Sequence, residues 1–589
     1  MNTAETLVNL IESDGNQFIF GHPGEQILPF YKALKESSIK HILTRHEQGA
    51  THAADAYARS SGEYGICIST AGPGAMNLVM GVSTAFKDSV PMLVITGDND
   101  YCQKDLDNFQ TFPINSVFEN ITIKSFHPSD AKSAVLNMLE ALIILHKFPK
   151  GPVHINLSKN VLLEELDFDS IDLEDIDLSD LGLGTSNLDD LNSMGLFSFD
   201  DAIFKEFINL FSFDSSSSND FSQNSLCNVD SNIELAIEKL QVSKKPLVIV
   251  GNGILWSKSI VKLNEFLSKT MFPIVTTYHS KGIISEYDKL NLGIVGLRGN
   301  SLSNYAYDNS DCILVLGAKL SERTIASSDF DIAKPKIIHV NIDKNCLKGD
   351  INICADVSFF LDCLLDKFEN DDSFSSDDWL DEIYSNYEEQ IVDGIDDIKE
   401  NFNPLRPPYV INKVISSFKG AHFLSDAGTH TTWTTLIAKS DSFGKLLFSG
   451  GFGPMGYALP GAIGAAFALK KNEDNGKVVV ICGDGDIQMV IQELATIREY
   501  DLNVDVFIIN NSQLGIIRQW EETVYDFGRY EVDLNNPDFA KLADAYGIDS
   551  ASVVSKDDLI SAINSALNSE GPFLADIHVA EENIPMPKK

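Results

Sequence analysis

The chain has 589 residues, 44% of them hydrophobic, which is enough for three or four domain-sized units with buried cores. Its formal net charge of −40 at pH 7 argues against binding to nucleic acids or anionic membranes. We expect no signal peptide and no membrane span, because basic and long apolar runs are missing. Eight scattered cysteines form no CxxC pair, which favours reduced thiols and a cytoplasmic location.

Strands and helices alternate through residues 1–160, which predicts a parallel, doubly wound sheet. Three predicted strands run into segments that contain Gly24, Glu47 and Gly72. By itself, Glu47 is explained as a carboxylate stabilised at a helix N-terminus, and Gly72 is as easily a tight turn as a ligand contact. The strands of this unit are predicted at residues 18–20, 39–44, 65–69 and 91–96.

Two acidic stretches divide the rest of the chain. Residues 161–235 are rich in aspartate and serine, a composition that favours a flexible insertion between domains. Residues 366–405 are acidic with helical spacing and end at a proline-rich boundary. These stretches separate a central α/β unit at 236–365 from a C-terminal unit at 406–589. The central strands are predicted at residues 246–250, 274–276, 312–316 and 337–342.

The C-terminal unit contains the most specific pattern. A buried strand at 478–482 leads into Gly483-Asp484-Gly485, a helix is predicted at 487–500, and a second strand at 504–509 ends before Asn511. The carboxyl ends of parallel strands bind ligands, and Asp484 and Asn511 offer hard oxygen ligands for Mg²⁺. The two glycines would let a diphosphate approach a helix N-terminus. An ordinary Asp-Gly turn explains the first motif alone but not the pair.

This GDG…NN pattern resembles the thiamine-diphosphate motif. Three further segments are similar to those of acetolactate (acetohydroxyacid) synthase catalytic, or large, subunits: RHEQGATHAADAYAR at 45–59, NFQ at 108–110 and LGIIRQW at 514–520. The similarity covers nearly the whole chain except the two acidic stretches. It implies an α/β fold of three domains, each built on a doubly wound parallel sheet. The N-terminal domain (1–160) would bind the pyrimidine of the cofactor, the second would be the central domain, and the C-terminal domain would bind the diphosphate.

The resemblance assigns roles to candidate catalytic residues. Glu47 would hydrogen-bond the cofactor's pyrimidine and promote removal of the C2 proton. Gln110 would face the reaction centre, and Lys159 would lie at the substrate entrance. Arg323 would bind the carboxylate of a second 2-ketoacid, which Trp520 would also contact. Without the resemblance, a solvated lysine at 159 and a packed tryptophan at 520 would be the preferred interpretations, and a surface ion pair would explain Arg323 nearly as well.

The resemblance also implies the cofactors. Met455, otherwise an ordinary core methionine, would support the cofactor rings, and the metal ligands would be Asp484, Asn511 and the backbone carbonyl of Gln513. The central domain of this family holds FAD, but Leu297-Arg298 and Ser321-Glu322 depart from the usual pattern there. The implied cofactor-binding set is Gly24, Glu47, Gly72, Met455, Gly483, Asp484, Gly485, Asn511, Gly515 and Ile516.

The implied reaction decarboxylates pyruvate and joins the remaining fragment to a second pyruvate or to 2-ketobutyrate, as in branched-chain amino-acid (isoleucine and valine) biosynthesis. The implied assembly is a homodimer or tetramer, with a possible small regulatory subunit. Two alternatives stay open: another thiamine-diphosphate-dependent 2-ketoacid decarboxylase or lyase, and a non-catalytic paralogue of the same fold. The glutamate, aspartate and asparagine of the motifs are all present, which favours an enzyme.

Overall fold

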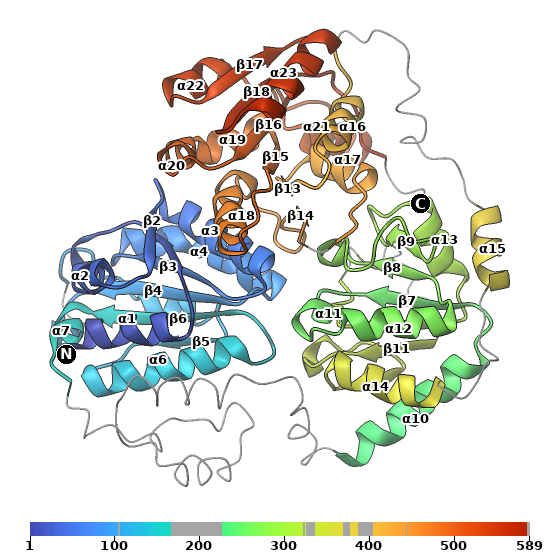
Figure 1. The fold of residues 1–589 in the computed structure, drawn as a ribbon, viewed down its shortest axis with the longest axis horizontal. Coiled ribbons are helices and arrows are strands. Elements are labelled where there is room, and N and C mark those ends of the chain that lie inside the picture. Colours follow the sequence, from blue (N-terminus) through green and yellow to red (C-terminus); the bar gives the residue numbers. More distant parts are fainter. Residues whose placement is uncertain are drawn as a thin grey trace.

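Three domains, each built on a six-stranded parallel sheet, make up the molecule (Figure 1). This confirms the predicted fold class. Helices cover the sheets on both faces, because strands buried on both sides need apolar cover. No helix in the described ranges combines the length and the apolar character needed to cross a bilayer. The computed structural model describes residues 1–103, 107–166, 226–321, 324, 336–368, 377–386, 404–442 and 444–585.

The N-terminal sheet has the strand order β2-β1-β3-β4-β6-β5. The chain leaves β1 toward β2 and then crosses to β3 on the other side, so the order reverses between β1 and β3. Ligands bind at such points in open α/β sheets. Its strands are β1 Phe18–Gly21, β2 Lys40–Leu43, β3 Gly65–Ser69, β4 Met92–Asp98, β5 Lys124–Phe126 and β6 Pro152–Ser158. Its helices are α1 Thr3–Ser13, η1 Glu25–Ile27, α2 Leu28–Glu36, α3 Glu47–Ser61, α4 Pro73–Asp88, η2 Tyr101–Gln103, α5 Ile114–Phe118, α6 Ala131–His146 and α7 Lys159–Leu163.

The central sheet has the order β12-β11-β10-β7-β8-β9, with its reversal between β7 and β10. Its strands are β7 Pro246–Val250, β8 Ile274–Thr276, β9 Asn291–Ile294, β10 Cys312–Leu316, β11 Lys336–Val340 and β12 Ile351–Ile353. Its helices are α10 Leu226–Val242, α11 Gly253–Trp256, α12 Ile260–Thr270, η7 Tyr278–Ser280, α13 Ser301–Asn309, η8 Lys344–Cys346, α14 Val357–Phe368 and α15 Asp377–Ser385.

The C-terminal sheet has the order β14-β13-β15-β16-β18-β17 and reverses between β13 and β15. Its strands are β13 His422–Ser425, β14 Leu446–Leu447, β15 Val478–Gly483, β16 Val504–Asn510, β17 Asp549–Val553 and β18 Phe573–His578. Its helices are α16 Pro407–Ser417, α17 Thr429–Ile437, α18 Ala458–Lys471, α19 Asp484–Val490, η10 Ile491–Glu493, α20 Leu494–Glu499, α21 Gly515–Thr523, α22 Phe539–Ala545 and α23 Lys556–Asn568.

Helices α3 and α18 join the N-terminal and C-terminal domains within the chain and lie side by side in Figure 1. Both are rich in alanine and glycine, so their backbones approach closely. A methyl group added at Gly464 would lie 1.8 Å from the carbonyl oxygen of Ala53. The contact belongs to the largest apolar core of the chain, which therefore spans both domains.

One predicted helix differs from expectation. The helix predicted at 487–500 is broken into α19, η10 and α20, because Val490 has φ −140° and the following turn carries Glu493 toward the N-terminal domain. In the second acidic stretch, Trp379 of α15 is buried and donates a hydrogen bond to the Pro246 carbonyl, so this helix packs on the central domain. Most of the predicted insertion, residues 167–225, lies outside the described residues.

Candidate active site

A cleft of about 290 Å³ opens at the carboxyl edge of the C-terminal sheet, where the strand order reverses. The loops after β13 and β15 form its floor, and α21 and the loop before α18 form its sides. The cleft brings together most of the residues predicted for the diphosphate end. These are Met455, Gly483, Asp484, Gly485, Asn511, Gln513, Gly515, Ile516 and Trp520.

Asp484 lies at the bottom of this cleft, at the first position of α19. Its carboxylate accepts a hydrogen bond from the Asn536 side chain (2.6 Å), a residue that the sequence did not single out. Burial raises the pKa of Asp484, although the Asn536 hydrogen bond opposes the shift. The side-chain oxygen of Asn511 accepts a hydrogen bond from the Gln513 backbone (3.2 Å). A buried carboxylate beside an amide oxygen is a donor set that suits a hard cation.

Two glycines of the cleft, Gly485 and Gly515, lie so close to neighbouring side chains that a larger residue would crowd them. A methyl group on Gly485 would lie 3.1 Å from the terminal carbon of Met455, so this methionine sits directly over the Gly-Asp-Gly turn. A methyl group on Gly515 would lie 3.0 Å from the Asn511 side-chain nitrogen. These glycines keep the backbone open to a ligand at the start of two helices.

Three polar residues of the cleft carried no assignment from sequence. Asp426 follows β13, and its carboxylate accepts backbone hydrogen bonds from Gly456 (2.9 Å) and from the first turn of α18. Asp486 caps α19 and lies 3.3 Å from Nε2 of His430. Burial lowers the pKa of His430 to about 4, so its imidazole is neutral at pH 7. An acidic residue directly after a buried strand was the available signal for Asp426.

A second cluster lies at the carboxyl edge of the N-terminal sheet. Glu47 begins α3, and its carboxylate accepts a hydrogen bond from the Asn77 side chain (3.0 Å). Gly72 has a left-handed backbone (φ 56°), and a methyl group there would lie 2.7 Å from the Gln110 carbonyl oxygen. Gly24 packs against Thr70 in the neighbouring loop. Gly24, Glu47, Gly72 and Gln110 thus belong to one edge, as the strand order requires.

This N-terminal cluster contributes no residue to the cleft of the C-terminal domain. The two clusters are therefore separate within one chain. Lys159 lies at the start of α7, where its amino group is 3.3 Å from the exposed Glu25 carboxylate. Arg323 lies outside the described residues.

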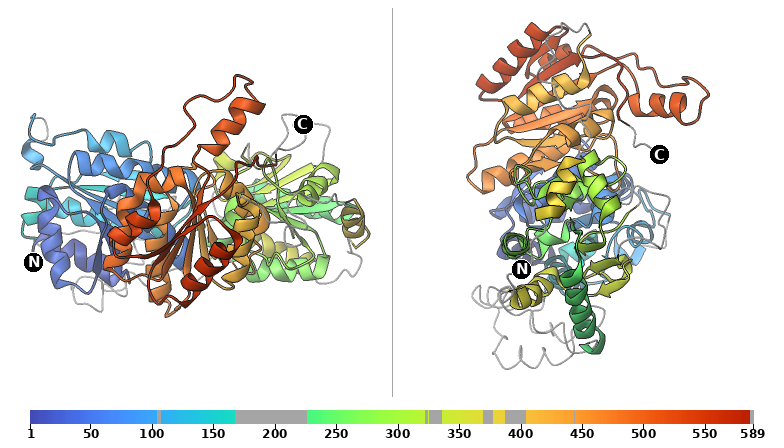
Figure 2. Two further views of the ribbon diagram at one scale, coloured as in Figure 1. Left: turned by 90° about the horizontal axis from the view of Figure 1, so that it is seen from above. Right: turned by 90° about the vertical axis from the view of Figure 1, so that its right-hand side faces the viewer.

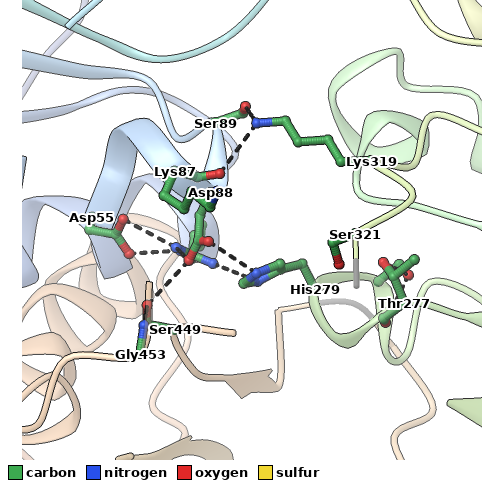
Figure 3. Close-up of polar contacts among 12 residues, drawn as sticks. Asp55, Lys87, Asp88, Ser89, Thr277, His279, Lys319, Ser321, Ser449 and Gly453 are labelled. Carbon is green, nitrogen blue, oxygen red and sulfur yellow. Dashed lines mark hydrogen bonds and ion pairs between the residues drawn. The ribbon is translucent and has the colours of Figure 1, made fainter. Parts of the chain in front are cut away.

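A buried ionic network joins all three domains next to the cleft (Figure 3). The Arg59 guanidinium donates to Asp55 (2.7 Å) and Asp88 (2.9 Å), and His279 of the central domain lies 3.2 Å from Asp88. Burial opposes ionisation of Asp88, but His279 and Arg59 hold its pKa below the ordinary value. The Ser449 hydroxyl, on the cleft wall, donates to Asp88 (3.3 Å). The network thus fixes the loop that carries Met455 against both other domains.

Comparisons with known proteins agree with this geometry. The chain matches three family models described as thiamine pyrophosphate enzyme: the N-terminal TPP binding domain at residues 1–117, the central domain at 233–364 and the C-terminal TPP binding domain at 426–577. It is 33% identical to an acetolactate synthase large subunit of Cyanidium caldarium, across 98% of this chain and 93% of that protein.

The chain belongs to the acetolactate synthase large-subunit family. A probable acetolactate synthase large subunit of Methanocaldococcus jannaschii is 32% identical over 100% of this chain and 93% of its own length. Acetolactate synthase 1, chloroplastic, of Nicotiana tabacum is 30% identical over 99% of this chain and 82% of its own length. As a member of the acetolactate synthase family with both TPP binding domains, the chain is a thiamine-diphosphate-dependent enzyme.

Proposed function

We propose that this chain is the catalytic subunit of an acetolactate synthase, which decarboxylates pyruvate and joins the fragment to pyruvate or 2-ketobutyrate. The observation that carries the proposal is the cleft, because it combines Asp484, Asn511, Met455 and Trp520 at one sheet edge. Thiamine diphosphate supplies an electron sink for decarboxylation when it is bound. The glycine turns and helix N-termini of the cleft suit its diphosphate.

We propose Mg²⁺ as the ion that bridges the diphosphate to the protein. Asp484 and Asn511 offer oxygen ligands, and the Gln513 carbonyl is the third ligand suggested by the sequence resemblance. Burial raises the pKa of Asp484. A bound cation would lower this pKa again, since it favours the ionised carboxylate.

The N-terminal half-site supplies the proton chemistry. Glu47 would hydrogen-bond the pyrimidine ring of the cofactor. That bond would favour the basic form of the ring, which takes the proton from the cofactor C2 position. Because Glu47 does not reach the cleft of its own chain, a homodimer is the smallest active unit in this proposal, and a tetramer would pair two such dimers. In Figure 2, α21 and the segment after it stand away from the body of the domain. That region exposes Val524, Tyr525 and Phe527, which would be covered by the partner.

FAD, the cofactor that the resemblance suggested for the central domain, stays a prediction. At the reversal between β7 and β10, the backbone of Gly253 bonds to Gly317 (2.9 Å), and a methyl group on Gly251 would lie 2.3 Å from Ala318. The absorbance of the purified protein tests directly whether it binds a flavin.

The decisive experiment incubates the protein with pyruvate, thiamine diphosphate and Mg²⁺ and identifies the product. Acetolactate is expected. Acetaldehyde alone would instead support the alternative of a simple 2-ketoacid decarboxylase, which the departures at Leu297-Arg298 and Ser321-Glu322 motivate. Failure to bind thiamine diphosphate would support a non-catalytic paralogue. Glu47→Gln is expected to lose most activity while keeping cofactor affinity, and full activity of that variant would contradict the role of Glu47.

The relatives are named large subunits, so we also propose a small regulatory partner, to be sought by co-purification. A cytoplasmic location stays a prediction. The thiols of Cys67, Cys312 and Cys482 are free and buried, as expected for reduced cysteines.

A further inference from the structure

Asn536 connects the two strand ends that carry the proposed metal ligands. Its side-chain nitrogen donates to Oδ2 of Asp484 (2.6 Å), which follows β15, and to Oδ1 of Asn510 (3.0 Å), the last residue of β16. Its amide oxygen accepts a hydrogen bond from the Gln488 side chain (3.0 Å) on α19. Asn510 donates its own amide N–H to Asp576 (2.9 Å), which leaves its oxygen to accept from Asn536. One orientation of the Asn536 amide therefore satisfies all of these partners.

Backbone hydrogen bonds hold the segment that carries Asn536 beside the metal-binding loop at 511–514. They run in antiparallel fashion, each 2.8 Å long, from the N–H of Leu514 to Val532 and from the N–H of Leu534 to Ser512. Asp484 is 2% exposed, so its hydrogen bond from Asn536 is shielded from competition with water. Because the segment is fixed independently of Asp484, Asn536 orients the Asp484 carboxylate rather than following its movements.

We propose that Asn536 selects Mg²⁺ over Ca²⁺ by holding Oδ2 of Asp484, so that the carboxylate offers the ion only its other oxygen. This inference rests on the metal site of the proposed function. Mg²⁺ requires near-ideal octahedral geometry with short bonds, whereas Ca²⁺ takes a larger, flexible shell of oxygens and accepts bidentate carboxylates. A carboxylate that is held at one oxygen suits Mg²⁺ and gives Ca²⁺ one ligand fewer. Asn536 is thus a positioning residue, since it acts on the ion through Asp484.

The test measures the concentrations of Mg²⁺ and of Ca²⁺ that give half-maximal binding of thiamine diphosphate to the chelator-treated, full-length protein. Asn536→Ala releases Oδ2 of Asp484. The Mg²⁺ affinity is then expected to fall roughly 10- to 100-fold, the usual effect of losing a residue that orients a metal ligand. The Ca²⁺ affinity is expected to stay or rise, because both carboxylate oxygens can then face the ion. The ratio of the two affinities therefore falls, whereas general damage to the fold would lower both affinities alike.

Asn535→Ala is the matched control, because Asn535 precedes Asn536 and is exposed, so both affinities are expected to stay at wild-type values. Gln488 is also exposed, and Gln488→Ala removes the bond that orients the Asn536 amide, so a smaller fall in the ratio is expected. The proposal is overturned if Asn536→Ala keeps the wild-type ratio or lowers both affinities equally. If that variant does not fold, a wild-type ratio in Gln488→Ala overturns it. If the wild-type protein binds thiamine diphosphate equally well without divalent cations, the proposed metal site fails, and this inference fails with it.

Discussion

Glu493 is expected to position the helix that begins with Glu47, although it belongs to the opposite domain. It is fully buried, and its carboxylate accepts hydrogen bonds from the backbone N–H groups of Arg45 (3.0 Å) and His46 (2.9 Å). Those two residues immediately precede α3. A methyl group on Gly49, one turn later, would lie 2.5 Å from the same carboxylate. The turn before Glu47 is therefore shaped around this carboxylate.

The loss of stability on removing the Glu493 carboxylate can be estimated from the hydrogen-bond donors that lose their acceptor. Glu493→Ala leaves two N–H groups without an acceptor, and each such loss costs about 1–3 kcal/mol when buried. Both bonds are partly buried, so we expect the free energy of unfolding to fall by about 2–4 kcal/mol. Glu493→Gln keeps the oxygen that accepts from Arg45 and His46, but it loses the charge and replaces the oxygen that accepts from the Thr496 hydroxyl with an NH₂ group. A fall of about 1 kcal/mol is expected, since the two backbone donors keep their acceptor.

The functional effect is expected at the cofactor rather than at the substrate. A shift of Glu47 by a fraction of an ångström would slow deuterium exchange at the cofactor C2 position, on the order of 10- to 100-fold in Glu493→Ala. Thiamine-diphosphate affinity is expected to stay unchanged, and Glu493→Gln should recover most of the exchange rate. Urea denaturation and a quenched exchange assay read out the two effects.

Glu499→Gln is the matched control. Glu499 lies on the next helix, α20, and pairs with the side chain of the same Arg45, but this ion pair is exposed. Such pairs contribute less than about 1 kcal/mol, so the control should leave stability and exchange nearly unchanged. The reasoning is refuted if Glu493→Ala exchanges deuterium at the wild-type rate, or if Glu499→Gln slows exchange equally.

Three further outcomes are expected. Burial raises the pKa of Asp505 to about 7 despite its ion pair with Lys477, so its contribution to stability is lost as pH rises. From pH 5 to pH 8 the wild type should lose roughly 2–3 kcal/mol more than Asp505→Asn in chemical denaturation, and parallel pH profiles would contradict this. Gly464→Ala should lower the melting temperature strongly, because its methyl group would meet the Ala53 carbonyl, and an unchanged melting curve would show that α18 can move. Asp484→Asn should weaken Mg²⁺-dependent cofactor binding at least about tenfold in a titration, since it removes the charged ligand, and an unchanged Mg²⁺ titration would exclude Asp484 as a ligand.

Local pattern predicted much of the fold. The strands β3, β7, β8 and β10 have the expected bounds, because each is a short apolar run between turn residues. The polar groups at strand ends, such as Asp484, were also predictable, since parallel strands bring their carboxyl ends to one edge. What this pattern leaves out are contacts between distant segments.

The broken helix at Val490 illustrates the limit. Residues 487–500 have continuous helical spacing, and nothing local indicates a break. The break occurs because the following turn directs Glu493 to backbone donors of the N-terminal domain, more than four hundred residues earlier. Asp426 received no role from the sequence for a related reason, since the backbone donors that bind its carboxylate lie on another element.

The same distant contact links the two half-sites. In each chain, the helical segment from Asp484 to Glu493 begins at the proposed metal ligand and ends at the carboxylate that holds the turn before Glu47. If the partner subunit completes each cleft, this segment connects the diphosphate end of one site with the proton-transfer end of the other. The close α3–α18 contact keeps that connection rigid, since its backbones leave no room for a methyl group at Gly464. The chain is therefore built so that the geometry of each half-site depends on packing between domains rather than within one.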